Sequence, residues 1–111
     1  MKIDFDSIEE KCIPEFKGGL GAAVIRSFED DTIKVIKGCL EKGSSIGMHT
    51  HEGNSETVYI LEGCGKMVYD GTEEPLQAGS CSYCPEGHTH SLINTGETPL
   101  LFLGVIPKLN N

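Results

Sequence analysis

Four histidines and one glutamate stand at positions where their side chains could meet. The histidines, His49, His51, His88 and His90, all fall between positions 49 and 90 of the 111-residue chain. His49 and His51 are two apart in a predicted strand, and strand side chains alternate with a period of two, so both point to one face. Glu56 begins the next predicted strand and His90 begins a later one. A hairpin would bring Glu56 across from the histidine pair.

Three imidazoles and one carboxylate that converge in this way suit a divalent metal of the first transition row. Manganese, iron, cobalt, nickel, copper and zinc all accept such ligands. Positions left open for water or substrate would make this a working site and not only a structural clip. The alternative for an isolated His-x-His pair is an ordinary polar strand face, and the pair alone does not decide between the two.

Short apolar or alternating runs between turn signals fill the chain from Gly21 onward. They predict strands over 22–28, 32–40, 45–51, 56–61, 65–69, 73–77, 80–84, 89–94 and 100–106. Strands that recur every 8–12 residues with turn glycines indicate an antiparallel sandwich or barrel. Asp70-Gly71 predicts a two-residue hairpin turn. A short helix is expected before Pro14, because Ser7 and Glu10 have the capping-box spacing.

Two glycine-framed motifs surround the histidines. Gly43, His49, His51, Glu56 and Gly63 follow the pattern G-x5-H-x-H-x4-E-x6-G, and Gly79, Pro85, Gly87, His90 and Asn94 follow G-x5-P-x-G-x2-H-x3-N. In this order and spacing the chain resembles the cupin superfamily, and in particular its small single-domain bacterial members. The Asp that many cupins carry after the first glycine of the second motif is Ser80 here, a change in a turn and not in the ligand set.

The resemblance implies an all-β fold, a cupin-type antiparallel β-barrel or jelly roll. It also implies that His49, His51, Glu56 and His90 hold one divalent transition metal. Residues 1–20 are expected to form an arm that packs on the barrel, and residues 21–111 a single barrel domain. The first functional expectation is a metal-dependent isomerase or lyase that acts on a small oxygen-rich metabolite such as a sugar, sugar acid or keto acid. The alternatives are a ligand-binding or sensing cupin without turnover and an iron-dependent dioxygenase.

His88 and Tyr83 are the candidate catalytic residues beside the predicted metal site. An imidazole titrates near neutral pH, so His88 could shuttle a proton; the alternative is a solvated histidine at the rim. Tyr83 would serve the same purpose if it faces inward, which the sequence leaves open. Cys81 and Cys84 form a C-x-x-C pattern, but strand positions three apart point to opposite faces. They are therefore not expected to chelate or to form a disulfide.

Charge and composition limit the partners and the compartment. Nine basic residues against seventeen acidic ones give a net charge of −8, which repels phosphate and argues against nucleic acids and anionic membranes. Five cysteines, an odd number, and an acidic N-terminus without a signal-peptide pattern favour a cytoplasmic protein with reduced thiols. The expected partners are a small-molecule ligand and a second copy of the chain, because so small a barrel cannot cover every apolar strand face.

Overall fold

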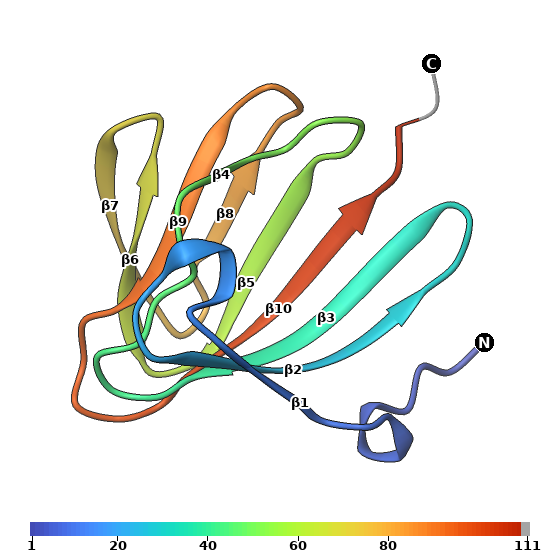
Figure 1. Ribbon diagram of the computed structural model, residues 1–111, viewed down its shortest axis with the longest axis horizontal. Coiled ribbons are helices and arrows are strands. Elements are labelled where there is room, and N and C mark those ends of the chain that lie inside the picture. The colour runs from blue at the N-terminus through green and yellow to red at the C-terminus, as the bar shows by residue number, and fades with distance from the viewer. Residues whose placement is uncertain (110–111) are drawn as a thin grey trace.

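Two antiparallel β-sheets face each other and enclose the core (Figure 1). The computed structural model describes residues 1–109. One sheet has the strand order β1 (Lys11–Pro14), β2 (Ala22–Glu29), β3 (Ile33–Leu40), β10 (Leu100–Pro107), β5 (Glu56–Glu62), β8 (Cys81–Cys84). The other has the order β4 (His49–Thr50), β9 (Thr89–Asn94), β6 (Cys64–Tyr69), β7 (Thr72–Gln77). Two short 3-10 turns, η1 (Phe5–Ser7) and η2 (Phe16–Gly18), stand on either side of β1.

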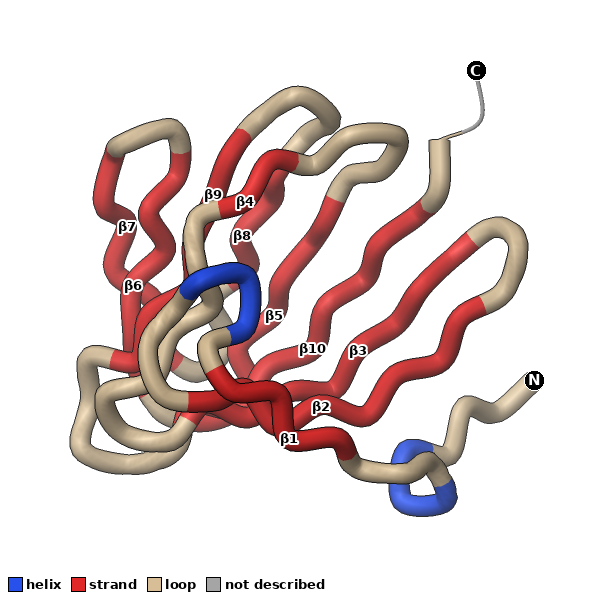
Figure 2. The backbone as a smooth tube through the Cα atoms, in the orientation of Figure 1, coloured by secondary structure: helices blue, strands red, loops and turns tan. Residues whose placement is uncertain are grey.

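The all-β architecture predicted from the strand pattern is confirmed. The strands converge at one end of the molecule and splay apart at the other (Figures 1 and 2). The result is an open jelly roll and not a closed barrel. The strand expected over 45–51 is reduced to β4, and Ser45 forms only an isolated bridge with Ile93.

The core lies between the sheets and follows the period of two along each strand. In β5, Val58 and Ile60 are buried while Tyr59 and Leu61 are exposed. Glycine shapes the core at one cross-strand pair, Gly38 and Phe102. A Cβ at Gly38 would lie 2.3 Å from Cζ of Phe102, so only glycine leaves room for this buried ring.

The Asp70-Gly71 hairpin joins β6 to β7 as predicted. Asp70 has φ of 47° and Gly71 has φ of 83°, which are the two positive values that a type I′ turn requires. The turn also brings Asp70 to the start of β9, where its carboxylate accepts a hydrogen bond from the amide of Thr89 at 3.0 Å.

The prediction of a short helix before Pro14 is wrong. Residues Lys11–Pro14 form the edge strand β1, with Ile13 paired to Ala23 of β2, and only the single turn η1 stands before it. A helix of about four residues forms too few hydrogen bonds to offset the cost of nucleation. The open edge of β2 offers backbone hydrogen bonds instead, so pairing with β2 overrides the capping signal. No helix among residues 1–109 is long and apolar enough to cross a membrane.

The turn after β1 carries the N-terminal segment against the loop that precedes β4. Lys17 adopts a left-handed conformation with φ of 56°, and the carbonyl of Phe16 accepts a hydrogen bond from the amide of Gly47 at 2.9 Å. A Cβ at Gly47 would lie 2.0 Å from the carbonyl oxygen of Lys17, so the two backbones meet closely only because this position is glycine. The segment thereby packs Phe16 against the core.

Candidate metal site

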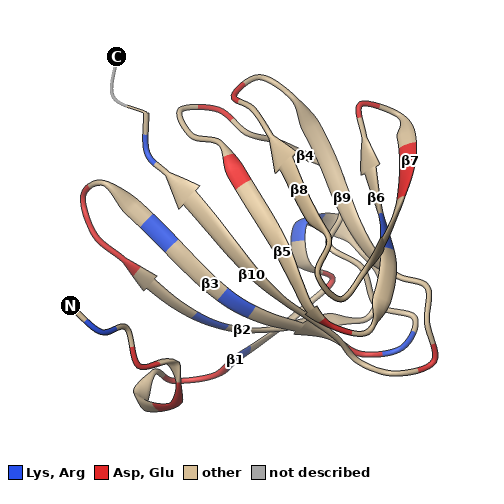
Figure 3. Cartoon of the chain, turned by 180° about the vertical axis from the view of Figure 1, so that it is seen from behind, with Lys and Arg blue, Asp and Glu red and all other residues tan. Residues whose placement is uncertain are grey.

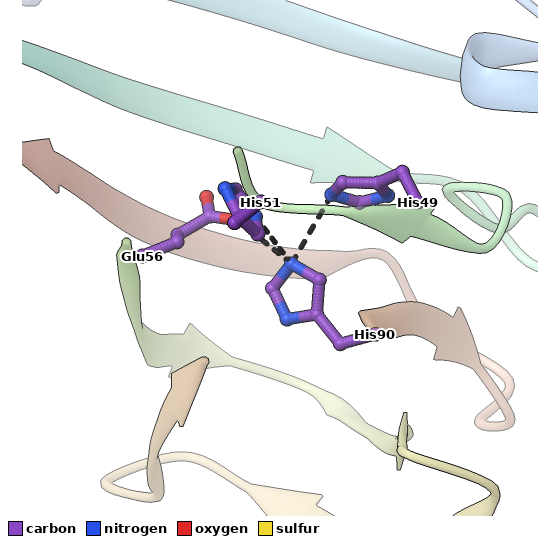
Figure 4. Close-up of side chains that lie close together, drawn as sticks. All are labelled: His49, His51, Glu56 and His90. Atoms are coloured by element: carbon purple, nitrogen blue, oxygen red, sulfur yellow. Dashed lines mark hydrogen bonds and ion pairs between the residues drawn. The ribbon is translucent and has the colours of Figure 1, made fainter. Parts of the chain in front are cut away.

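Three elements bring His49, His51, Glu56 and His90 together between the sheets (Figure 4). His49 lies in β4, His51 follows its end, and Glu56 is the first residue of β5. His90 lies in β9 directly across from His49. All four ligand atoms lie within 4.8 Å of one another, so the structure brings together the full set that the sequence indicated.

The imidazole nitrogens and the carboxylate approach as closely as ligands on one ion. Nε2 of His90 lies 2.9 Å from Nε2 of His51 and 3.1 Å from Nε2 of His49. Oε1 of Glu56 lies 3.0 Å from Nε2 of His90 and 3.1 Å from Nε2 of His51. Donors that bind an ion at about 2.0–2.2 Å are about 2.8–3.1 Å apart when they occupy neighbouring octahedral positions. The observed spacing therefore fits a transition metal ion.

Backbone and amide oxygens fix which nitrogen of each histidine points at the site. The carbonyl oxygen of Gly47 lies 2.7 Å from Nδ1 of His49 and can only accept, so Nδ1 carries the proton. Oδ1 of Asn54 lies 2.6 Å from Nδ1 of His51 and also accepts, so Nδ1 of His51 carries the proton. In both neutral rings Nε2 is then an unprotonated lone pair aimed at the centre of the cluster, as metal-ligating histidines require.

The cluster lacks enough protons to satisfy its own contacts. A proton on Nε2 of His90 can point to only one of His49, His51 and Glu56, and the Nδ1 atom of His90 is buried without a hydrogen-bond partner among residues 1–109. In the remaining close contacts, two lone pairs face each other with no proton between them. Since buried polar atoms are normally paired, a cation at the centre is the simplest way to satisfy all four groups.

The electrostatics of the cluster keep its carboxylate charged. Burial by itself would raise the pKa of Glu56, but the adjoining imidazoles of His51 and His90 outweigh burial when they carry a proton on Nε2, and they lower the pKa to about 2. The pKa of His51 is raised, first by its hydrogen bond to Glu56, while burial and the charge of Lys17 act in the opposite direction. Burial lowers the pKa of His49. A charged carboxylate beside a neutral imidazole is the state that binds a metal.

Three residues that the sequence analysis did not single out support the cluster. Gly47 and Asn54 orient the two histidines, and Gly104 of β10 makes room for the carboxylate. A Cβ at Gly104 would lie 2.7 Å from Oε2 of Glu56. Only Gly47 and Asn54 lie near the histidines in the sequence; Gly104 is distant from them, and only the β5–β10 pairing brings it to Glu56.

Replacing Gly104 by alanine is expected to weaken metal binding about tenfold or more, in the range seen for residues that orient ligands. The added Cβ meets the flexible end of Glu56 and not the backbone, so the fold should survive while the carboxylate moves. Metal titration followed by calorimetry measures the change. An unchanged affinity in a folded variant would show that Glu56 is not held against Gly104.

The four side chains line a cavity of about 460 Å³ between the sheets. Its wall continues over apolar residues of both sheets, including Ile36, Met67 and Phe102, and over Phe16 of the N-terminal segment. Charged residues also line it, namely Lys17, Glu29, Lys34, Glu52 and Lys108. These charged residues are exposed or half-buried, so they lie toward solvent, whereas the His/Glu cluster and the apolar wall residues lie deeper.

His88 and Tyr83, the candidate catalytic residues, lie elsewhere. Nδ1 of His88 is 2.5 Å from Oδ2 of Asp70 and 3.0 Å from the hydroxyl of Tyr69, and its ring stacks on Tyr69. Tyr83 is 58% exposed on the outer face of β8. Neither residue is among those that line the cavity, so the structure does not bring them to the cluster.

The C-x-x-C pair has the geometry expected of a strand. Cys81 is exposed and Cys84 is buried on opposite faces of β8. Burial raises the pKa of the Cys84 thiol to about 11, with the charges of Glu56 and Asp70 adding to the effect. All five cysteines are free, and a buried thiol with a raised pKa is a poor nucleophile and a poor redox group.

The chain is thus an open jelly roll with a buried His/Glu cluster, able to hold a metal ion, between its two sheets. Residues 37–106 match the family model described as the cupin domain, which covers more than half of the chain. The chain belongs to the cupin family. Both glycine-framed motifs, positions 43–63 and 79–94, lie inside the matched region.

Two relatives illustrate the range of proteins that this chain is similar to. An oxalate-binding protein from Thermotoga maritima is 46% identical over 67 residues, which is 60% of this chain and 55% of that protein. A glucose-6-phosphate isomerase from Thermococcus onnurineus is 30% identical over 64 residues, 53% of this chain and 34% of that protein. The chain spans about half, or less, of the length of the curated relatives it matches.

Solved structures show the same fold over nearly the whole chain. The crystal structure of a predicted oxalate decarboxylase from Thermotoga maritima has a TM-score of 0.91 and 33% identity, and the match covers 98% of this chain and 100% of that one. A sugar phosphate isomerase of the cupin superfamily from Silicibacter pomeroyi has a TM-score of 0.82 and 27% identity, covering 97% and 76%.

Proposed function

We propose that this cupin binds one divalent transition metal through His49, His51, Glu56 and His90 and uses it to bind a small oxygen-rich carboxylate. The observation that carries the proposal is the convergence of two imidazole lone pairs, a third imidazole and a charged carboxylate on one buried point. A divalent ion held there would act as a Lewis acid that attracts ligand oxygens and holds their negative charge.

The ligand class is supported by chemistry and by relationship. With four protein ligands, an ion that prefers six donors keeps about two positions for outside oxygens, which suits a chelating dicarboxylate, keto acid or hydroxy acid. The oxalate-binding protein from Thermotoga maritima is the relative of highest identity among those described above. Oxalate is therefore the first probe to use.

Binding is favoured over turnover by the lining of the cavity. Isomerase or lyase chemistry needs a group that moves a proton close to the reacting atoms. The two candidates for that task, His88 and Tyr83, do not line the cavity, and the ionisable residues that do line it outside the cluster are exposed or half-buried. The second candidate function is a sugar isomerase, which rests on the isomerase relatives alone.

Calorimetry with oxalate tests the proposed function. Protein loaded with Mn²⁺ is expected to bind oxalate, and the same protein stripped by a chelator is expected not to bind it. Analysis of the solution for loss of oxalate over hours distinguishes binding from decarboxylation. Undiminished binding to the stripped protein, or no binding of oxalate, pyruvate or malonate to the loaded protein, would contradict the proposal.

The outer face of the six-stranded sheet supports the further proposal of a homodimer. Tyr59 and Leu61 of β5 and Tyr83 of β8 are 43%, 41% and 58% exposed on it, and strands β8 and β10 carry no charged residue (Figure 3). Exposed apolar surface of this kind marks interfaces. We also propose a cytoplasmic location, where the five free thiols would stay reduced.

Sedimentation at micromolar concentration is expected to give twice the mass of the chain. Tyr83→Glu would place a charge in the proposed interface and should yield a monomer. Thr72→Glu, on an exposed position of the other sheet, is the control and should leave the dimer intact. A monomeric wild-type protein at these concentrations would refute the homodimer.

A further inference from the structure

Apolar side chains from both sheets wall the cavity around the metal cluster. Those that bear on the argument are Ile25, Ile36, Met67, Leu92, Phe102 and Ile106. Five of them are buried members of the core, and Ile106 packs half-buried against it. Any part of a ligand that extends along this wall therefore meets hydrocarbon, which favours an apolar group over a polar one.

The polar groups of the cavity are either at its edge or already engaged. Nζ of Lys108 lies 2.8 Å from Oε2 of Glu29 and donates to the carbonyl of Asp30 at 2.7 Å. These residues and Lys34 stand at the ends of β2 and β3 and just after β10, at the splayed end of the sheets (Figure 3). Asn54 lines the cavity too, but its Oδ1 is committed to His51.

The cavity is larger than the chelating head of a ligand. Its volume of about 460 Å³ falls within the range of about 300–1,000 Å³ that suits ligands of drug size. Oxalate would leave most of this space unfilled and the apolar wall without contacts. The part of the apolar wall that oxalate does not contact contributes nothing to its affinity. A ligand whose hydrocarbon part contacts this wall should therefore bind more tightly than oxalate.

A sugar fits this wall poorly. Each of its hydroxyl groups loses hydrogen bonds to water on entry and needs a protein partner in exchange. The wall formed by Ile36, Phe102 and Ile106 offers hydrocarbon instead. A sugar that extends along this wall would thus be left with unpaired hydroxyls.

We propose that the site takes a 2-oxo or 2-hydroxy carboxylic acid with a hydrocarbon tail. The oxygen-rich head lies at the His/Glu cluster and the tail lies along Ile36, Phe102 and Ile106. The proposal rests on the proposed function, because it needs the head to bind at the cluster. Oxalate and glucose-6-phosphate, which the names of the relatives give, have no such hydrocarbon tail.

A homologous series of acids tests the proposal. Calorimetry on the Mn²⁺-loaded protein compares pyruvate, 2-oxobutanoate, 2-oxohexanoate and 2-oxooctanoate. Burial of each added methylene is expected to lower Kd about fourfold, so 2-oxooctanoate, with five more carbons, should bind up to about a thousandfold more tightly than pyruvate. 2-Keto-3-deoxygluconate, a hydroxylated chain with the same six carbons as 2-oxohexanoate, should bind no better than pyruvate.

A matched pair of variants on β10 locates the tail. Ile106→Phe fills the cavity and should raise Kd for 2-oxooctanoate about tenfold while leaving pyruvate within about twofold. Val105→Phe changes the neighbouring residue, which lies on the outer face of the same strand, and should leave both values unchanged. A circular dichroism melt checks that both variants are folded.

The outcomes separate this inference from the proposed function. If oxalate and pyruvate bind only to the loaded protein but Kd stays flat or rises along the series, the hydrocarbon tail is wrong and the proposed function stands. If the series improves in the wild type and equally in Ile106→Phe, the tail lies elsewhere and the assigned wall is wrong. If no acid binds the loaded protein, both fail.

Discussion

His90→Ala is expected to reduce the metal bound by the purified protein from one equivalent to below about one tenth of an equivalent. His90 contacts all three other members of the cluster through Nε2, at 2.9 to 3.1 Å, so its loss opens the centre of the site. Elemental analysis after extensive dialysis measures the bound metal.

His88→Ala is the matched control for that variant. The side chain removed is the same, two residues earlier, but it contacts Asp70 and Tyr69 and does not line the cavity. The His88→Ala variant should keep a full equivalent of metal. Equal loss of metal in both variants would mean that the cluster alone does not hold the ion.

Metal binding is also expected to stabilise the fold strongly. An ion present at a hundred times its Kd adds about 2.7 kcal/mol to the free energy of unfolding, which corresponds to a rise of about 10–20 °C in Tm for a domain of this size. The rise is physically reasonable because the ion replaces lone-pair contacts in the buried cluster. Differential scanning calorimetry with added Mn²⁺, and then with excess chelator, should show the rise and its reversal.

The His51→Ala variant should show no such rise, because Nε2 of His51 contributes to the closest contact of the cluster, at 2.9 Å. The stripped wild-type protein is the reference for both. An equal rise of Tm in His51→Ala would show that Mn²⁺ stabilises the protein from another site.

Local pattern predicted most of the strands, and the resemblance to cupins supplied the ligand set. The period of two in β5 places Glu56, Val58 and Ile60 on the inner face, and the two histidine motifs place the imidazoles. These features depend on neighbours within a few residues, or on motif spacing that the resemblance to cupins supplies. The sequence therefore indicates the cluster through motif spacing alone.

What the sequence could not show depends on contacts between distant segments. Pairing with the edge of β2 holds Lys11–Pro14 in a strand, although the capping-box spacing favours a helix. Gly104 gives Glu56 its room through a pairing of β10 with β5, and the inward or outward direction of Tyr83 follows from the register of β8 with β5. None of these can be obtained from spacing along one segment.

The location of the metal is tested most directly by anomalous X-ray scattering from crystals of the Mn²⁺-loaded protein. One peak is expected between the two sheets, about 2.0–2.3 Å from Nε2 of the three cluster histidines and from a carboxylate oxygen of Glu56. A loaded crystal with no peak among these four side chains, or with the only peak at another place on the protein, would contradict the metal site on which the proposed function depends.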